Sequence, residues 1–345
     1  MCAEFNHLSN LRKIIYTFVL GEKFLVIMKK SVKVTLIIVG VVLALFLAVT
    51  FGGGAYMVKF ALQPADRGFD MEQERAKMES RCPGIVNWWD SLYNKGALRD
   101  TFVVFPDGRK LHAMYAFADV KTPKTAIIIH GYQNNPINMS VIARMYKDSL
   151  GYNVFLPGLH AHGQSDGAAI QMGWKDREDV LKWIPIAHEL FDDSEQVIHG
   201  FSMGAATTMM VSGEPTPDYV KAFIEDAGYS SVWEMFKDQL KEQFGLPAFP
   251  VLYGADLVCR MRFGWGFREA SSLKQLAKCK KPMLFIHGDS DDFVPTWMMM
   301  PCYEAKTEGY KEYWLAPGSI HVFASIDHPA EYCRRTRAFL EKAGM

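Results

Sequence analysis

The chain lacks the sequence features of several common classes of protein. Its 345 residues contain no Gly-x-Gly-x-x-Gly or P-loop pattern, which argues against a nucleotide cofactor. The six cysteines form no Cys-x-x-Cys pair and show no zinc spacing. Basic and acidic residues number 38 each, so no excess of positive charge indicates nucleic-acid binding. We therefore expect no cofactor, no metal and no nucleic-acid partner.

Charge is absent from one long stretch of the chain. Residues 34–58 contain no Asp, Glu, Lys or Arg, and about 20 apolar residues suffice to cross a bilayer as a helix. Residues 1–33 carry six basic and two acidic side chains. Because positive charge favours the cytoplasmic side, we expect a cytoplasmic segment over 1–33, a single membrane-spanning helix over 34–58, and an extracytoplasmic domain held at the cell membrane.

A cleaved signal peptide is the alternative for this stretch. The residues from Met28 resemble a signal n-region, with Met28 as an alternative start, and Gly53-Gly54-Ala55 offers small residues for cleavage. The apolar run is longer than the h-region of about 7–15 residues that signal peptides carry. We therefore favour an uncleaved anchor.

The rest of the chain alternates between strand-like and helix-like segments. Residues 59–100 are polar and predict a linker with a lead-in helix. Residues 101–118 read as a β-hairpin with a Pro-Asp-Gly turn. Short apolar runs such as "TAIIIHG" and "PMLFIHG" then alternate with amphipathic segments, which is typical of a mostly parallel sheet covered by helices. The sequence thus predicts an α/β domain over 101–345, with a helical lid or insert at 229–281.

Serine, acid and histidine follow successive predicted strands. "GFSMG" at 200–204 places Ser202 between two glycines at a strand-to-helix turn, as in a nucleophile elbow. Asp291 follows the strand that ends at His287, and His321 follows the last strand. Ligands of such sheets bind at the carboxyl ends of the strands. This order of residues predicts a Ser-His-Asp triad for acyl transfer.

These motifs resemble those of the α/β-hydrolase superfamily, and in particular its bacterial membrane-anchored, S33-peptidase-like or Bem46-like group. The resemblance rests on "GFSMG", "HGDSDDFVP" and "GSIHVFASIDHPAEY" and covers residues 103–340. It implies an α/β-hydrolase fold in which Ser202 is the nucleophile, His321 the base and Asp291 the acid. The family's "HG" motif falls on residues 130–131, which implies that the backbone N–H groups of Tyr132 and Met203 form the oxyanion hole.

Several assignments have close competitors in the sequence. Three other carboxylates, those of Asp226, Asp289 and Asp292, are rivals for the role of the acid. His328 is a rival for the role of the base, but we expect it to cap a helix. His160 and His162 form a His-x-His pair, but no third ligand follows at a suitable step. Relatives often carry Asp-x-Arg-Gly-x-Gly-x-Ser-x-Gly here, whereas this chain has "PGLHAHGQSDG", with His160 or a neighbour in place of the arginine.

We therefore expect a membrane-anchored serine hydrolase that acts on small-molecule carboxylic esters through an acyl-enzyme. A serine peptidase or amidase of the same architecture is the first alternative, because fold and triad do not fix the leaving group. A catalytically silent α/β-hydrolase domain used for binding is the second.

Overall fold

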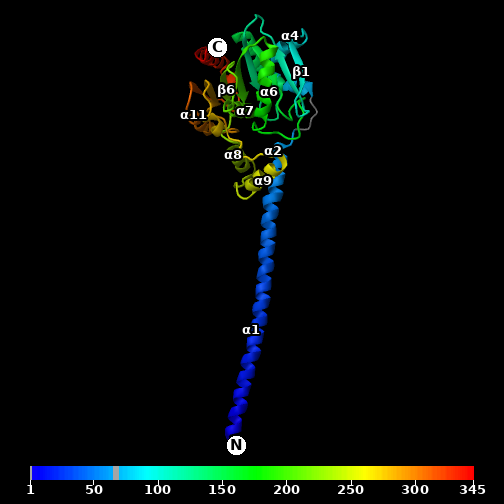
Figure 1. Ribbon diagram of the computed structural model, residues 1–345, viewed down its shortest axis with the longest axis vertical. Helices are drawn as coiled ribbons and strands as arrows, with labels where there is room; N and C mark the ends of the chain where they lie inside the picture. The colour runs from blue at the N-terminus through cyan, green and yellow to red at the C-terminus, as the bar shows by residue number, and fades with distance from the viewer. Residues whose placement is uncertain (1, 65–69) are drawn as a thin grey trace.

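The N-terminal part of the chain is one long helical rod that leads into a compact domain. The computed structural model describes residues 2–64 and 70–345. The rod consists of α1 (Cys2–Leu47), the π-helical turn η1 (Ala48–Gly52) and α2 (Gly53–Leu62) (Figure 1). Residues 29–62 are long and apolar enough to cross a membrane. The side chains of residues 29–49 are all exposed.

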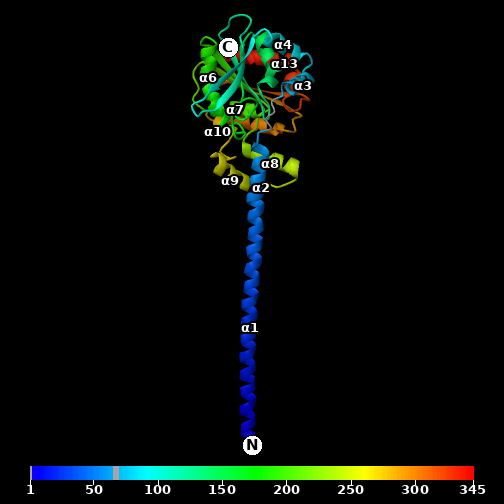
Figure 2. The same ribbon diagram turned by 90° about the vertical axis from the view of Figure 1, so that its right-hand side faces the viewer.

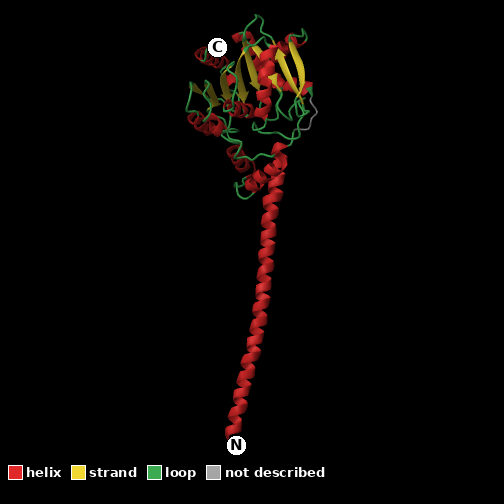
Figure 3. Cartoon of the chain, in the orientation of Figure 1, coloured by secondary structure: helices red, strands yellow, loops and turns green. Residues whose placement is uncertain are grey.

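An eight-stranded sheet forms the centre of the domain (Figure 3). Its strand order is β1-β2-β4-β3-β5-β6-β7-β8, in which β2 runs antiparallel to both of its neighbours and the remaining pairs are parallel. This arrangement confirms the predicted fold, including the hairpin at its start. The strands are β1 (Leu98–Val104), β2 (Lys110–Ala116), β3 (Lys124–Ile129), β4 (Asn153–Pro157), β5 (Glu195–Phe201), β6 (Val220–Asp226), β7 (Met283–Gly288) and β8 (Lys311–Ala316).

The apolar strands are buried on both faces because helices cover both sides of the sheet. In β3, Ile127 and Ile129 belong to one apolar core while Ala126 and Ile128 belong to the other, as the two-residue period of a strand requires. Four helices pack into the first core, namely α6 (Asp176–Leu190), α7 (Met203–Ser212), α10 (Ser272–Leu276) and α11 (Met299–Ala305). Three pack into the second, namely α4 (Ile85–Tyr93), α5 (Ser140–Arg144) and α13 (Pro329–Lys342).

The helical segments of the domain follow the order expected from the sequence. The stretch after Pro136 is split into three types of helical turn before Gly151 ends it in a left-handed conformation. The segments are α3 (Met71–Arg81), α4 (Ile85–Tyr93), η2 (Pro136–Met139), α5 (Ser140–Arg144), η3 (Met145–Leu150), α6 (Asp176–Leu190), α7 (Met203–Ser212), α10 (Ser272–Leu276), η4 (Thr296–Met298), α11 (Met299–Ala305), α12 (Ala324–Asp327) and α13 (Pro329–Lys342).

Two further helices, α8 (Val232–Phe244) and α9 (Val251–Phe263), form an insert between β6 and β7. A β-bridge between Ser231 and Ser271 closes the neck of this insert, and each of these serines caps the helix that follows it. Both helices lie where the rod enters the domain (Figures 1 and 2). The insert thus lies beside the end of the apolar rod.

The rod and the insert touch through glycines. A Cβ at Gly54 would lie 2.5 Å from the backbone nitrogen of Ala255, and a Cβ at Gly254 would lie 1.9 Å from the carbonyl oxygen of Thr50. Such small residues let two helix backbones approach closely. Val58 and Leu62, farther along α2, are buried in the domain core. The rod is therefore packed into the fold at its end.

Gly54→Val should loosen this contact. The valine has no space against α9, and overpacking typically costs about 1–3 kcal/mol, so the unfolding temperature of the detergent-solubilised full chain should fall by several degrees. Gly40→Val is the matched control, because nothing lies within 4 Å of a Cβ at Gly40. Equal unfolding temperatures for the two variants would contradict the close packing of α2 on α9.

Candidate active site

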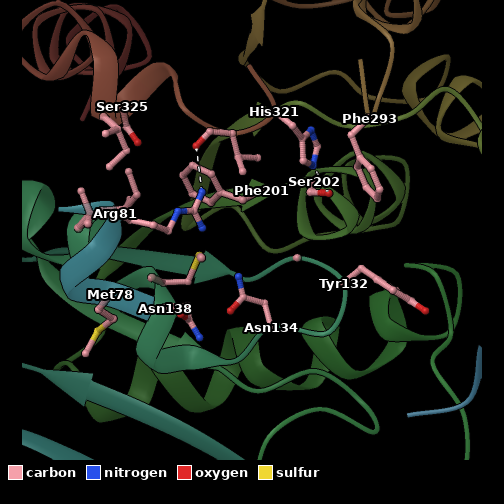
Figure 4. Close-up of a pocket in the computed structure, with 16 residues that line it drawn as sticks. Met78, Arg81, Tyr132, Asn134, Asn138, Phe201, Ser202, Phe293, His321 and Ser325 are labelled. Carbon is pink, nitrogen blue, oxygen red and sulfur yellow. Dashed lines mark hydrogen bonds between the residues drawn. The ribbon is translucent and has the colours of Figure 1, made fainter. Parts of the chain in front are cut away.

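The site lies at the carboxyl ends of the central strands. Ser202 follows β5, Asp291 follows β7, and His321 follows β8. Parallel strands deliver their carboxyl ends to the same edge of a sheet, so three residues far apart in the sequence meet in one place. The structure brings together all three residues that the sequence singled out, and Figure 4 shows the His321 ring facing the Ser202 side chain.

Ser202 occupies a strained turn between β5 and α7. Its φ of 55° and ψ of −117° lie in a region that non-glycine residues rarely adopt. The turn is crowded on both sides: a Cβ at Gly200 would lie 2.0 Å from the carbonyl oxygen of Gly204, and a Cβ at Gly204 would lie 2.2 Å from that of Ile129. Both glycines thus leave the room that this tight turn requires.

A chain of short hydrogen bonds joins the three side chains. The Ser202 Oγ lies 2.8 Å from His321 Nε2, and His321 Nδ1 lies 2.7 Å from Asp291 Oδ2. With the imidazole proton on Nδ1, the histidine donates to the carboxylate and its Nε2 accepts from the serine hydroxyl. This is the arrangement that lets a histidine take a proton from serine while a carboxylate fixes its tautomer.

Asp291 is held in its ionised form by contacts with two backbone N–H groups and two histidines. Its Oδ1 accepts from the backbone N–H groups of Phe293 and Val294 at 3.1 and 3.0 Å. Its Oδ2 lies 3.2 Å from His287 Nε2, in addition to the bond from His321. Burial raises the pKa of the Asp291 carboxyl, but the hydrogen bonds from His287 and His321 outweigh it and lower this pKa to about 2. The carboxylate is therefore negative throughout the neutral range.

The sequence marks His287 only as the end of the strand that precedes the acid. In the structure its Nε2 also lies 2.8 Å from the carbonyl oxygen of Val294, so it contacts both Asp291 and the loop that carries this carboxylate. Burial lowers the pKa of His287, but the interactions with Asp291 and Glu225 raise it by more. The pKa of His287 is therefore raised overall. The four-residue step between His287 and Asp291 is the sequence signal for this contact.

The rival acids and the rival base have other partners. Asp226 is buried and accepts a 2.8 Å hydrogen bond from the Tyr332 hydroxyl, and burial raises its pKa to about 7. Asp289 accepts from the backbone N–H of Gly318, and Asp292 is exposed. His328 stands at the N-cap of α13 as expected, but its ring bonds to the Pro317 carbonyl oxygen instead of capping the helix amides.

The two predicted oxyanion-hole residues flank Ser202. Met203 is the first residue of α7, where backbone N–H groups have no acceptor within the helix. Gly131, which precedes Tyr132, approaches so closely that a Cβ there would lie 3.2 Å from Ser202 Cβ. His130 orients this loop, because its Nε2 accepts a 2.9 Å hydrogen bond from the Leu159 N–H.

The two histidines of the His-x-His pair have different neighbours, since His162 packs against the His130 ring and His160 contacts an arginine. His160 Nδ1 contacts the guanidinium of Arg109, which forms a bidentate ion pair with Asp179 on α6 at 2.7 Å for each bond. A guanidinium from the hairpin thus lies beside His160, in the loop that follows β4. No group of three or more potential metal ligands occurs within residues 2–64 and 70–345.

Two cavities meet at Ser202. One, of about 240 Å³, has a mixed lining that includes His321, Arg81 and Asn138 (Figure 4). The other, of about 380 Å³, is mainly apolar and is walled by the insert and by α2; its lining comprises Met57, Phe60, Ala61, Tyr132, Gln133, Met172, Ser202, Met203, Tyr229, Met235, Phe236, Gln239, Leu240, Gln243, Phe244, Leu252, Ala255, Phe267 and Phe293. Ser202, Tyr132 and Phe293 line both cavities.

Comparison with known proteins agrees with this geometry. Residues 156–344 match the prolyl oligopeptidase family. The uncharacterized protein YqkD of Bacillus subtilis is 31% identical over 228 residues, which cover 66% of this chain and 74% of that protein. Protein bem46 of Schizosaccharomyces pombe is 23% identical over 261 residues, covering 75% of this chain and 74% of that protein.

Solved structures show the same fold. The Pyrococcus furiosus esterase Pf2001 superposes with a TM-score of 0.58 at 22% sequence identity, over 73% of this chain and 95% of that one. The resemblance to the α/β-hydrolase superfamily and its Bem46-like group is confirmed by these relatives. The chain belongs to the prolyl oligopeptidase family of α/β hydrolases.

Proposed function

We propose that the protein is a membrane-anchored serine hydrolase that cleaves carboxylic esters through an acyl-enzyme. The observation that carries this proposal is the hydrogen-bonded series Ser202, His321 and Asp291 on a strained strand-to-helix turn. A serine hydroxyl is a weak nucleophile until a base removes its proton. A turn with this strain persists only when its surroundings enforce it, and such strain is concentrated at functional sites.

The proposed reaction proceeds in two halves. The Ser202 Oγ attacks the ester carbonyl while His321 Nε2 takes its proton, and the negative charge on the carbonyl oxygen is stabilised by the backbone N–H groups of Tyr132 and Met203. His321 then gives the proton to the departing alcohol, which leaves an ester of Ser202. Water then attacks this ester while His321 takes its proton, and His321 returns that proton to the Ser202 Oγ as the acid leaves.

The two cavities suit the two parts of an ester. The leaving alcohol must receive its proton from His321, so it belongs in the cavity that His321 lines. The acyl chain then extends to the other side of Ser202, into the mainly apolar cavity beside Met203. An apolar cavity of this size favours an aliphatic acyl group because burying each CH₂ contributes about 0.8 kcal/mol.

Peptide or amide cleavage is the second candidate. The family match to prolyl oligopeptidases favours it, and a triad alone does not discriminate between ester and amide substrates. Acyl esters of p-nitrophenol assayed beside aminoacyl anilides distinguish the two. We expect the ester with the longer acyl chain to have the higher kcat/KM, since it fills more of the apolar cavity.

Anchoring to the membrane is part of the proposal. The rod presents exposed apolar side chains over residues 34–49, and α9 adds exposed apolar groups beside it, including Tyr253, Leu257 and Met261. Apolar surface that surrounds the base of an apolar helix is well placed to rest on a bilayer. The lysines before residue 34 favour a cytoplasmic N-terminus, which places the hydrolase domain outside the cytoplasm.

Ser202 should react covalently with a fluorophosphonate probe. The probe requires a serine activated by a base, so the wild-type full chain should be labelled at this residue, and Ser202→Ala should lose both labelling and turnover. Its unfolding temperature should stay close to that of the wild type, because losing a hydroxyl leaves no large cavity. His321→Ala should also suppress labelling. A folded wild type that is not labelled would favour a catalytically silent binding domain, and full labelling of Ser202→Ala would exclude this nucleophile.

Asp291→Asn should lower kcat strongly while the protein remains folded. The amide favours the wrong tautomer of His321, and a comparable change in a serine protease costs about 10⁴-fold. Asp226→Asn is the matched control, because Asp226 is equally buried but is hydrogen bonded to Tyr332. Steady-state kinetics of both variants on one ester provide the measurement. A larger loss of kcat in Asp226→Asn would overturn the assignment of the acid.

Protease added to intact spheroplasts that express the full chain should degrade the hydrolase domain and spare the N-terminal segment. Protection of the domain until the membrane is broken would contradict the proposed orientation. Sequencing of the mature N-terminus provides the control for processing. A mature N-terminus near Tyr56 would identify a cleaved signal peptide, whereas the buried Val58 and Leu62 would remain with the domain.

A further inference from the structure

Arg81 places a positive charge in the cavity that His321 lines. It is the last residue of α3, and its guanidinium extends from that helix into the cavity beside Ser202 (Figure 4). Asn134 and Asn138 contribute side-chain amides to the same cavity. The residues that line this cavity include no Asp or Glu. The charge of this cavity is therefore positive.

The guanidinium makes few contacts within the described part of the chain. Its Nη2 donates one long hydrogen bond of 3.5 Å to the carbonyl oxygen of Val322, and its Cζ lies 5.1 Å from the centre of the Phe323 ring. No ion pair of residues 2–64 and 70–345 includes Arg81. Arg75, on the same helix, forms a bidentate ion pair with Asp90 at 2.5 and 2.6 Å. Arg81 thus keeps most of its five donors available.

The carboxyl group of Asp226 does not neutralise the charge of Arg81. Burial lowers the pKa of Arg81, and Asp226 raises it in part. Asp226 already accepts a hydrogen bond from the Tyr332 hydroxyl, and burial raises the pKa of Asp226 to about 7. An arginine remains protonated in proteins, and a half-buried guanidinium with free donors is costly unless an anion pairs with it. The planar guanidinium can donate two parallel hydrogen bonds, which fit the paired oxygens of a carboxylate or a phosphate.

We infer that Arg81 binds an anionic group, a carboxylate or a phosphate, on the leaving alcohol of the substrate. This inference rests on the proposed ester hydrolysis, which assigns the cavity beside His321 to the alcohol. The substrate class is then an ester with an aliphatic acyl chain on one side of Ser202 and a compact acidic alcohol on the other. Arg81 acts as a specificity-determining residue and takes no part in the proton transfers.

The test compares esters that share one acyl chain and differ in the charge of the alcohol. The full-length protein in detergent is assayed with 1-hexanoylglycerol 3-phosphate against 1-hexanoylglycerol, and with the hexanoyl ester of 3-hydroxypropanoate against the methyl ester of that compound. The first pair tests a phosphate and the second a carboxylate. The readout is the ratio of kcat/KM for the charged ester to kcat/KM for its neutral partner.

The wild type should prefer the charged member of at least one pair. Arg81→Gln should lower that ratio by about tenfold or more, the range expected for losing a hydrogen bond between charged groups, and Arg81→Lys should retain part of it. Arg75→Gln is the matched control on α3 and should leave the ratio unchanged. The pair that shows the preference identifies the anion.

Two results would overturn the inference. If Arg81→Gln lowers kcat/KM for both members of a pair by the same factor, Arg81 only supports the segment of Val322 and Phe323. If the wild type is labelled at Ser202 and hydrolyses the esters without preferring a charged one, the anion site is refuted while the proposed hydrolysis stands. Absence of both labelling and ester hydrolysis would instead refute the proposed function, and this inference with it.

Discussion

The close approach of the β5–α7 turn to β3 is the constraint on which the site depends. A Cβ at Gly204 would lie 2.2 Å from the Ile129 carbonyl oxygen, and one at Gly200 would lie 2.0 Å from the Gly204 carbonyl oxygen. Only glycine fits at these positions. This packing holds Ser202 in its strained conformation and brings the loop of Gly131 against the serine. The serine and the proposed oxyanion donors therefore share one rigid support.

The apolar rod and the proposed acyl cavity are physically continuous. Met57, Phe60 and Ala61 of α2 line that cavity, and the Ala61 carbonyl oxygen accepts a 2.9 Å hydrogen bond from the Tyr132 hydroxyl. Tyr132 also follows the glycine that approaches Ser202. The end of the expected anchor and the start of the expected linker thus form one wall of the site. In our proposal, this continuity lets an acyl chain near the bilayer enter the cavity without crossing polar surface.

Local patterns in the sequence were sufficient to predict the fold, the strained turn and the three residues that meet there. Each of these features depends on a short motif at a strand end, and the order of strands brings the ends together. Contacts between distant segments could not be predicted in this way. The Arg109 guanidinium reaches Asp179 from the hairpin, and Arg81 reaches the cavity from a helix in the expected linker. No periodicity or spacing connects such residues, because their proximity results from how whole layers pack.

The central claim is that Ser202 carries the acyl group during turnover. Rapid acid quenching of the full chain with a hexanoyl ester, followed by intact-mass measurement and peptide mapping, tests it directly. The account predicts an added hexanoyl group on the peptide that contains Ser202, formed within the first turnover and lost as the ester is consumed. Ester hydrolysis without any acylated species, or acylation at a residue other than Ser202, would contradict it.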